Sequence, residues 1–402
     1  MNFIQNSKIT DPQGYTAAAM RAGFKRKRKD LCIIKSDVPA ICSVKFTKNM
    51  VKAAPLLVAM ESLKKSGNML QALIINSGNA NAGTGQQGLK DTYEIIQLFS
   101  EKIDVPKELI LASSTGVIGE LLDMNKMRDG IDNLSPQLSV DGGIGCAEAI
   151  LTTDTVEKSF GVKLDIQGVE VTISGIAKGS GMIQPNMATM LAFVTTDAEI
   201  EHELLERIFT ECVEKNFNMI SVDGHTSTND MALVMANGQA YNPPIQVGTP
   251  EAEVFQEALM YLTREMAKAI IRDGEGATKF VTIRLEQVNS FANARKMAFG
   301  IANSALVKTA LFGQDPNWGR ILSAAGMVGV KFDPDRTDLE INGTYIYKAG
   351  NPIRLDKPVL KQLMAPPELE IILTVNTGAE AATVYTTDLS YDYVRINAEY
   401  HT

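Results

Sequence analysis

The segment KGSGMIQPNMATML, Lys178–Leu191, consists of a glycine-rich turn, a Pro-Asn pair and the start of an apolar run. The run Met190–Val194 predicts a short buried strand after this turn. Ala188 and Thr189 lie where the strand begins, and the small Ala188 leaves its carbonyl carbon open to attack by the Thr189 hydroxyl. Such an attack gives an ester that water can cleave. The segment therefore predicts a cut that exposes Thr189 as a new N-terminus.

A threonine at a new N-terminus brings its own general base. The unperturbed pKa of an α-amine is about 7.7–8.0, so this amine can take the proton of the hydroxyl near neutral pH. The chain offers few alternatives, because it has only His202, His225 and His401, and no G-x-S-x-G elbow. On spacing alone, however, a threonine entering a strand is usually structural, and that interpretation stays open at this point.

Two further segments have the residues that an acyl-transfer site needs. Ser113–Gly119, SSTGVIG, follows a predicted strand at Leu109–Ala112. Its small residues let a backbone N–H point into a cavity, and the Thr115 hydroxyl adds a second donor for an oxyanion. Lys178 can pair with a substrate carboxylate. The alternatives are a plain strand-to-helix turn for the first segment and a solvated lysine for the second.

The segment Asp273–Gly276, DGEG, places carboxylates on a turn that opens a predicted strand, which suits a substrate ammonium group. Its alternative is a turn that ends a helix.

Gly83–Gly88, GTGQQG, matches the dinucleotide pattern G-x-G-x-x-G. A polar loop, Asn76–Ala82, separates it from the preceding strand, and Asp104 stands before the next strand rather than after it. We interpret this glycine motif as a helix-capping turn.

The composition is that of an ordinary globular protein. The 402 residues are 45% hydrophobic and 21% charged, and the formal net charge is −8, which does not favour a nucleic-acid or anionic-membrane partner. The basic run Lys25–Lys29 is short, and we expect it to be a solvated face. The four cysteines never lie closer than ten residues, so neither zinc sites nor a disulfide framework is expected. No signal peptide or membrane span is apparent, which predicts a cytoplasmic protein.

Strand and helix patterns alternate along the whole chain and predict a mixed α/β (α+β) protein. Expected strands are Leu31–Ile34, Ala40–Phe46, Leu73–Ile75, Leu109–Ala112, Val169–Ile176, Met190–Val194, Lys279–Leu285, Leu369–Val375 and Ala381–Thr386. Expected helices are Leu89–Ile103, Leu204–Phe217, Val254–Ile271 and Phe291–Phe312. The proline-rich Tyr241–Pro250 is expected to be a flexible connection.

Taken together, these motifs resemble the ornithine acetyltransferase family of arginine biosynthesis, the bifunctional glutamate N-acetyltransferases. The resemblance spans nearly the whole chain, and its most specific part is the PNMATML block. The matching segments are Lys178–Leu191 (KGSGMIQPNMATML), Ser114–Gly119 (STGVIG), Asn76–Gly83 (NSGNANAG), Leu151–Lys158 (LTTDTVEK), Arg272–Lys279 (RDGEGATK), Gly313–Arg320 (GQDPNWGR) and Tyr393–Thr402 (YVRINAEYHT).

The resemblance implies a particular reaction and assembly. The precursor would cut itself between Ala188 and Thr189 into an α chain, 1–188, and a β chain, 189–402, and the two would pair as an α2β2 heterotetramer with sites built from both chains. Thr189 would carry the acetyl group from N2-acetylornithine to glutamate in a ping-pong cycle. Thr115 and Gly116 would form the oxyanion hole. The implied substrate contacts are Thr152 (preferred over the adjacent Thr153), Lys178, Thr189, Glu275, Asn397 and Thr402.

The fold implied by the resemblance is a two-lobed α/β sandwich of the N-terminal-nucleophile-like type, not a Rossmann fold. No metal or organic cofactor is implied. Some members of the family also accept acetyl-CoA, which would be a co-substrate, and the sequence does not show which residues decide this. Two alternatives remain: an N-terminal-nucleophile aminopeptidase or amidase that uses water as acceptor, and a non-catalytic amino-acid-binding protein.

Overall fold

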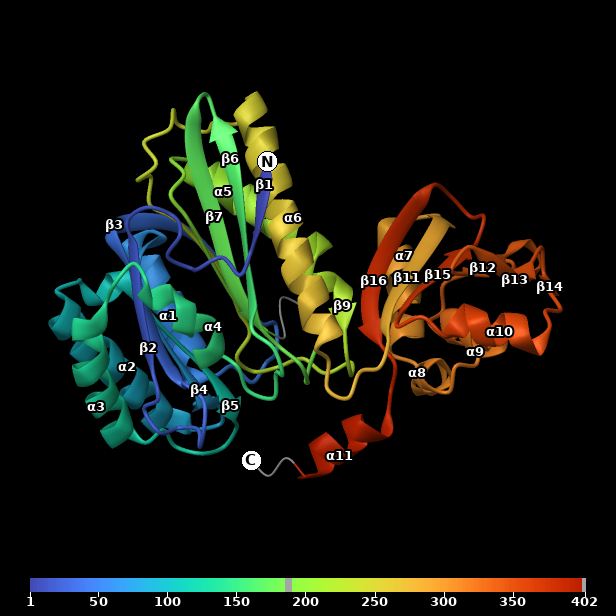
Figure 1. Ribbon diagram of the computed structural model, residues 1–402, viewed down its shortest axis with the longest axis horizontal. Helices are drawn as coiled ribbons and strands as arrows, with labels where there is room; N and C mark the ends of the chain where they lie inside the picture. Colours follow the sequence, from blue (N-terminus) through green and yellow to red (C-terminus); the bar gives the residue numbers. More distant parts are fainter. Residues whose placement is uncertain (185–189, 400–402) are drawn as a thin grey trace.

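The computed structural model describes residues 1–184 and 190–399 and has two lobes, each built on one β-sheet with helices packed against it (Figure 1). The mixed α/β prediction with two lobes is confirmed. The predicted segments Ala188, Thr189 and Thr402 lie outside the described residues. Within the described part of the chain, no helix is long and apolar enough to cross a membrane.

The first lobe contains a nine-stranded sheet in the order β1-β6-β7-β8-β10-β3-β4-β5, with β2 paired to β3. The pairs β4/β5 and β8/β10 are parallel and the other pairs antiparallel, so this is not a doubly wound sheet. Its strands are β1 (Asn2–Gln5), β2 (Tyr15–Met20), β3 (Leu31–Phe46), β4 (Met69–Asn79), β5 (Ile110–Val117), β6 (Lys158–Ile166), β7 (Val169–Lys178), β8 (Leu191–Thr196) and β10 (Met231–Ala236).

The long strand β3 connects two layers of this sheet. Its register with β4 shifts between Lys35 and Ala40, around Pro39. The first part of β3 pairs with β2 and β4, and the last part pairs with β10. Apolar side chains of β4 and β5 share one buried cluster with Phe193 of β8 and Leu233 of β10, so the two layers pack face to face.

Helices cover the outer faces of both layers. On one side, α2 and α3 pack on β4 and β5 through residues such as Phe99 and Met127. On the other side, α5 and α6 cover β6, β7, β8 and β10. Successive side chains of β8 alternate between the cluster beneath α5 and α6 and the cluster between the two layers. Both faces of the strand are therefore buried, as its unbroken apolar sequence predicts. The helices are α1 (Ala54–Ser66), α2 (Gly85–Ile103), α3 (Met124–Leu134), α4 (Cys146–Ala149), α5 (His202–Lys215) and α6 (Pro250–Arg272), with short 3-10 turns η1 (Lys107–Leu109), η2 (Ser135–Gln137), η3 (Gly142–Gly145) and η4 (Phe217–Met219).

The second lobe, orange and red in Figure 1, has a seven-stranded sheet in the order β14-β13-β12-β15-β11-β16-β9. Its core lies between the sheet and the helices α7 to α10. The strands are β9 (Ile220–Ser221), β11 (Phe280–Val288), β12 (Asp338–Ile341), β13 (Thr344–Lys348), β14 (Asn351–Pro352), β15 (Glu368–Thr374) and β16 (Glu380–Thr387). The helices are α7 (Phe291–Ala302), α8 (Ala305–Phe312), α9 (Trp318–Gly326), α10 (Lys357–Met364) and the 3-10 turn η5 (Pro334–Arg336).

The last helix, α11 (Tyr391–Glu399), runs from the second lobe back beneath the first (Figure 1). It contains no buried residue, so little apolar burial holds it in place. Polar contacts hold it instead: Tyr393 donates its hydroxyl to Asp223 at 3.3 Å, and Asn397 donates to Glu275 at 2.8 Å. The helix therefore brings the C-terminal region to the first lobe without becoming part of its core.

Several predicted elements need correction. The two runs predicted around Pro39 are one bent strand, β3. The single helix predicted over Phe291–Phe312 is two helices, because Ser304 caps a new helix by accepting the N–H of Val307. The connection predicted at Tyr241–Pro250 lies within the first lobe, between β10 and α6. The chain first contributes to the second lobe at the short strand β9, returns to the first lobe for β10 and α6, and supplies the rest of the second sheet after Arg272.

Candidate active site

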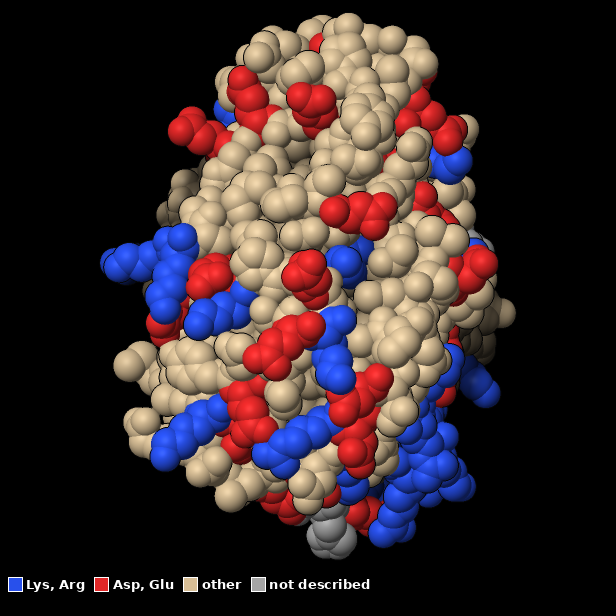
Figure 2. Space-filling model, turned by 90° about the vertical axis from the view of Figure 1, so that its left-hand side faces the viewer, with Lys and Arg blue, Asp and Glu red and all other residues tan. Residues whose placement is uncertain are grey.

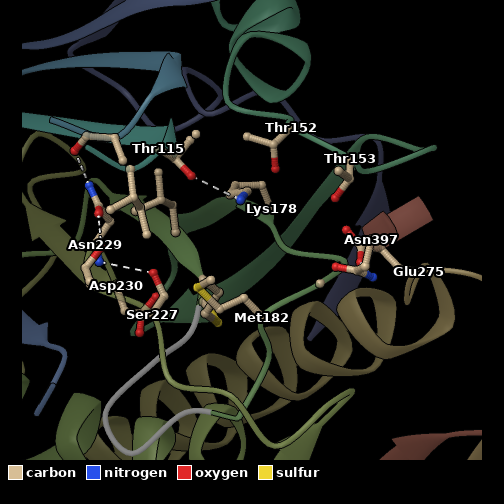
Figure 3. A pocket seen from close by; sticks show the side chains of 17 residues that line it. Thr115, Thr152, Thr153, Lys178, Met182, Ser227, Asn229, Asp230, Glu275 and Asn397 are labelled. Carbon is tan, nitrogen blue, oxygen red and sulfur yellow. Dashed lines mark hydrogen bonds between the residues drawn. The ribbon is translucent and has the colours of Figure 1, made fainter. Parts of the chain in front are cut away.

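A cavity of about 340 Å³ opens at one edge of the two-layered sheet (Figure 3). It lies where β4, β5 and β7 end and where β8 and β10 begin, so both layers contribute to its walls. Six residues proposed from the sequence line it: Thr115, Gly116, Thr152, Lys178, Glu275 and Asn397. The other lining residues are Ala80, Ile118, Thr153, Gly181, Met182, Met190, Leu191, Ser227, Thr228, Asn229 and Asp230.

Thr115 and Gly116 lie on the last residues of β5, not on a turn after the strand as expected. Gly116 has a φ of 133°, and a side chain there would collide with the backbone of Gly78 on β4, its partner in register. Only glycine fits this position. Because glycine has no side chain, the backbone of Gly116 is accessible from the cavity. Thr115 accepts a hydrogen bond from Lys178 Nζ at 3.2 Å, so its own hydroxyl hydrogen can point elsewhere (Figure 3).

Lys178 is the last residue of β7 and is almost fully buried. Burial lowers the pKa of its ammonium group and the neighbouring Lys158 acts in the same direction, whereas the carboxylates of Asp154 and Glu275 partly oppose this effect. A bound substrate carboxylate would act in the same direction as these two carboxylates, because an opposite charge favours the ammonium form.

A buried ion network supports this lysine from behind. Asp154 accepts hydrogen bonds from Lys158 Nζ at 2.8 Å and from the backbone N–H of Gly179 at 2.7 Å. Burial alone would raise the pKa of Asp154, but Lys158 and Lys178 outweigh it and hold the pKa well below its usual range. Lys158 also pairs with Asp273 at 2.6 Å. The sequence predicts that both carboxylates of the Asp273–Gly276 turn face a substrate. In the structure only Glu275 lines the cavity, because the Asp273 carboxylate is paired with Lys158.

Glu275 and Asn397 lie together at the end of the cavity away from Thr115 (Figure 3). Glu275 is almost fully buried, whereas Asn397 is exposed and forms the rim. Its amide donates to Glu275 Oε2 at 2.8 Å. A side chain at Gly181 would collide with the Glu275 carboxylate, so the glycine-rich turn makes room for this acid. The cavity thus has a cation near its inner end and a carboxylate near its rim.

Thr152 and Thr153 both line the cavity, between Lys178 and Glu275 in Figure 3. The backbone N–H of Thr152 donates to Asp154 at 3.0 Å, which fixes this turn to the buried ion network. Thr189, Ala188 and Thr402 are outside the described residues. Along the chain, Thr189 is bonded to Met190, which lines the cavity.

Sequence reasoning missed the segment Ser227–Asp230, which forms one wall of the cavity. Asn229 Nδ2 donates to the backbone oxygens of Ala80 at 2.6 Å and Ser114 at 2.8 Å, and so joins the two layers next to the oxyanion candidates. The available signal was the polar run TSTND directly before the apolar run MALVMA, Met231–Ala236. That pattern marks polar groups at the beginning of a buried strand.

Asp230 is the most unusual group in this wall. It is 2% exposed, and its Oδ2 atom has no hydrogen-bond partner among the described residues. Burial raises the pKa of its carboxyl well above the usual range, and Ser227 and Lys178 only partly offset this. A buried carboxyl that faces a cavity without a full set of partners is typical of functional sites.

The structure also shows the contacts of two further motifs, the glycine motif Gly83–Gly88 and the basic run Lys25–Lys29. In the glycine motif, Asn81 donates to the backbone oxygen of Gly88 and the hydroxyl of Thr92, both at 3.0 Å. The space over Gly88 is filled by Thr84 and Asn81; the turn leads into α2 with Thr84 as the N-cap residue, but the Thr84 side chain accepts no backbone N–H of the helix. The basic run Lys25–Lys29 is only partly a solvated face, because Lys25 and Arg28 bond to backbone oxygens of residues 151 and 154.

Within residues 1–184 and 190–399, no group of three or more His, Cys, Asp or Glu residues is placed to hold a metal ion. The four cysteines are free thiols and buried. The chemistry that the described cavity offers is therefore that of hydroxyls, backbone N–H groups, one ammonium and two carboxyls. The described cavity thus combines an ammonium group, carboxyl groups and hydroxyl and backbone donors at one edge of a two-layered α/β fold.

The chain belongs to the ArgJ family, whose model matches residues 16–402. It is similar to the arginine biosynthesis bifunctional protein ArgJ of Caldanaerobacter subterraneus subsp. tengcongensis, with 45% identity over 99% of this chain and 100% of that protein. Among solved structures, it is similar to ArgJ of Bacillus halodurans, with 43% identity, a TM-score of 0.44, and coverage of 46% of this chain and 98% of that one. It is also similar to the ornithine acetyltransferase of Mycobacterium tuberculosis in complex with ornithine, with 32% identity, a TM-score of 0.42, and coverage of 46% and 99%. The family resemblance found in the sequence is thus confirmed.

Proposed function

We propose that this protein is an acetyltransferase of arginine biosynthesis that moves the acetyl group of N2-acetylornithine to glutamate. The observation that carries the proposal is the cavity, in which Thr115, Gly116 and Lys178 lie at one end and Glu275 and Asn397 at the other. Family membership supports the same reaction.

The charges of the cavity fit amino-acid substrates. Both substrates carry an α-carboxylate, which Lys178 can pair with, and acetylornithine carries a side-chain ammonium group, which suits Glu275. The cost of burying these groups is offset only if each meets its partner, so a neutral substrate would leave Lys178 and Glu275 uncompensated. Thr152 and the Asn397 amide add neutral hydrogen bonds, and Thr402 is a further proposed contact.

Thr189 is the proposed nucleophile, and its reaction follows a ping-pong cycle. Its hydroxyl oxygen attacks the acetyl carbonyl, and its α-amine takes the hydroxyl proton. Thr115 and the Gly116 N–H stabilise the oxyanion. The C–N bond breaks and ornithine leaves with the proton. The glutamate amine then attacks the acetyl ester, gives N-acetylglutamate, and returns the proton to Thr189.

The nucleophile requires a cut between Ala188 and Thr189, which the chain would make itself. The products would be an α chain of 188 residues and a β chain of 214, since 402 − 188 = 214. The architecture supports their staying together, because β7 of the first fragment pairs with β8 of the second over six residue pairs, from Ile173 with Thr196 to Lys178 with Leu191. Assembly as an α2β2 heterotetramer in the cytoplasm is part of the proposal.

The intact mass of the purified protein under denaturing conditions tests the nucleophile. Two fragments divided at Ala188–Thr189 are expected in place of the 43.7 kDa chain. Thr189→Ala is expected to remain one chain and to lose acetyl transfer. A Thr189→Ala protein that is still cleaved and still transfers acetyl groups would contradict the proposal.

The acceptor needs a separate assay, because an amidase with the same nucleophile would use water. With acetylornithine present, transfer to glutamate is expected to exceed hydrolysis by a large factor. Release of free acetate at an unchanged rate with and without glutamate would instead favour the amidase.

A further inference from the structure

The basic segment Lys25–Lys29 lies beside the active-site cavity, at the same edge of the sheet. It connects β2 to β3, and Leu31 at the beginning of β3 is in register with Asn76 of β4, which is in register with Ser114 of β5. The backbone oxygen of Phe24 lies so close to Gly78 that a side-chain carbon there would come within 2.9 Å. Gly78 is the register partner of Gly116, so the segment is a near neighbour of the proposed oxyanion hole.

The segment has a defined shape, because the fully buried Asp30 organises its backbone. The Asp30 carboxylate accepts the N–H groups of Ala22 at 2.5 Å, Gly23 at 3.1 Å and Lys25 at 2.7 Å. A carboxylate that holds three backbone N–H groups fixes a turn firmly. The cationic side chains are thus presented from a preorganised loop.

Two of these side chains anchor the segment to the wall of the cavity. Lys25 Nζ donates to the Leu151 oxygen at 2.8 Å, and Arg28 donates to the Asp154 oxygen at 2.7 Å. Both contacts flank the turn whose Thr152 lines the cavity. Burial lowers the pKa of Lys25 to about 8, with Asp30 partly opposing this.

The other three basic side chains of the segment do not bond to this wall of the cavity. Arg26 and Lys27 are exposed, and among residues 1–184 and 190–399 only Lys29 of the five forms an ion pair, with Glu148 at 3.6 Å. On the face in Figure 2, red and blue mostly alternate, but the largest contiguous group of Lys and Arg lies at the lower right. Unpaired positive charge beside a cavity, in a chain of net charge −8, indicates an anionic ligand.

We propose that Lys25–Lys29 is a subsite for the phosphate groups of a coenzyme A thioester, with Arg26 and Lys27 in direct contact with them. The inference rests on the proposed function, because the acetyl end of this donor would enter the cavity described above. Its phosphates are joined to the thioester by a long flexible arm and would remain outside, over the basic segment. In the transfer itself, the Thr189 oxygen forms the new ester bond, the C–S bond breaks, and coenzyme A leaves as a thiol with the hydroxyl proton.

The test compares donors that differ in their phosphates. We would measure kcat/KM of the processed enzyme with glutamate as acceptor and with acetyl-CoA, S-acetyl-N-acetylcysteamine or acetylornithine as donor. In the double variant Arg26→Ala/Lys27→Ala, kcat/KM for acetyl-CoA is expected to fall about tenfold, through KM, because two charge contacts are lost. The phosphate-free thioester and acetylornithine are expected to change less than about twofold.

The matched control is Lys357→Ala/Lys361→Ala, two exposed lysines on α10 in the other lobe, which should leave all three donors unchanged. An equal fall in kcat/KM for all three donors in the Arg26→Ala/Lys27→Ala variant would overturn the inference. A wild-type kcat/KM for acetyl-CoA no higher than that for the phosphate-free thioester would also overturn it. Wild-type enzyme that uses acetylornithine but not acetyl-CoA would overturn this subsite and leave the proposed function standing. Failure with acetylornithine would instead count against the proposed function.

Discussion

At the scale of single residues, the site depends on positions where one side chain is the only one that fits. Gly116 is the clearest, because its positive φ and the backbone of Gly78 both exclude a side chain. Gly119 offers a matched comparison, since its φ is also positive, at 91°, but nothing lies within 4 Å of a side chain placed there. Substitutions at these two glycines therefore distinguish the effect of backbone strain, which both would suffer, from the effect of a collision with Gly78, which only Gly116 would suffer.

Gly116→Ala is therefore expected to lower kcat at least about a hundredfold, since it displaces the backbone that would hold the oxyanion. Gly119→Ala should cost only about 1 kcal/mol of stability, from backbone strain, and leave kcat within a few-fold of wild type. Steady-state kinetics and urea unfolding of both variants check this. Equal kinetic effects in the two variants would show that Gly116 has no special role.

Asp230 leads to a prediction about pH. Its pKa is raised in the folded protein, so the folded state holds this proton more tightly than the unfolded state. That contribution to stability is complete below about pH 4 and is lost as the pH rises toward the raised pKa. Asp230→Asn removes the ionisation, so the urea midpoint of the variant should rise relative to wild type from about pH 5 to about pH 8.

The exposed Asp37→Asn in β3 is the control for this experiment, as its side chain lies outside the cavity. A difference in midpoint between Asp230→Asn and wild type that stays constant with pH would contradict the assignment of the raised pKa to Asp230.

At the scale of elements, the sequence predicts what local pattern controls and misses what distant contacts create. The apolar run of β8 and the amphipathic α2 are predicted, because their periodicity reflects burial directly. The strand β2 is missed, because its short run YTAAAM is weakly apolar and depends on pairing with β3. The bend in β3 is read as two strands, since only the partners on either side show that the strand continues.

The site shows the same division. Motif chemistry points in advance to Thr115, Lys178 and the carboxylates of the Asp273–Gly276 turn, and the family resemblance adds Gly116, Thr152 and Asn397. Asp230 is not predicted, because the polar run before β10 marks polar groups at the beginning of a strand but does not show which of them is almost fully buried. Tertiary structure, not spacing, determines that environment.

The helix α11 leads to a prediction at this scale. It has no buried residue, yet it brings Asn397 to the cavity. A chain that ends at Ser390 should lose less than about 2 kcal/mol in free energy of unfolding, while KM for acetylornithine rises by about tenfold or more. Urea unfolding and steady-state kinetics measure the two effects. Arg395→Ala, an exposed change on the same helix, is the control, and a truncated enzyme with unchanged KM would exclude α11 from the site.

At the scale of the whole molecule, the two lobes share side chains across their boundary. Met219, from the first-lobe segment before β9, packs in the core of the second lobe. Phe280, from β11 of the second sheet, packs in a cluster of the first. The short strand β9 adds main-chain pairing to β16. Neither core is complete without the other, which favours cooperative unfolding.

Two natural probes can test this cooperativity. All four cysteines are buried in the first lobe, whereas the single tryptophan, Trp318, stacks on Tyr347 in the second lobe, with ring centroids 5.2 Å apart. In urea, thiol exposure to a chromogenic reagent and tryptophan fluorescence should change at the same midpoint. A tryptophan transition that clearly precedes thiol exposure would mean that the second lobe unfolds alone.

The strand order of the first sheet has a consequence for how the mature protein can arise. If the chain is cut as proposed, β8 and β10 of one fragment lie between β7 and β3 of the other. Made separately, the fragment 189–402 would present unpaired strand edges on both sides, which favour aggregation. The uncut precursor would thus act as an intramolecular chaperone that lets the sheet form while both halves are tethered. Cutting then leaves a kinetically trapped product, one whose separated halves are not expected to refold together.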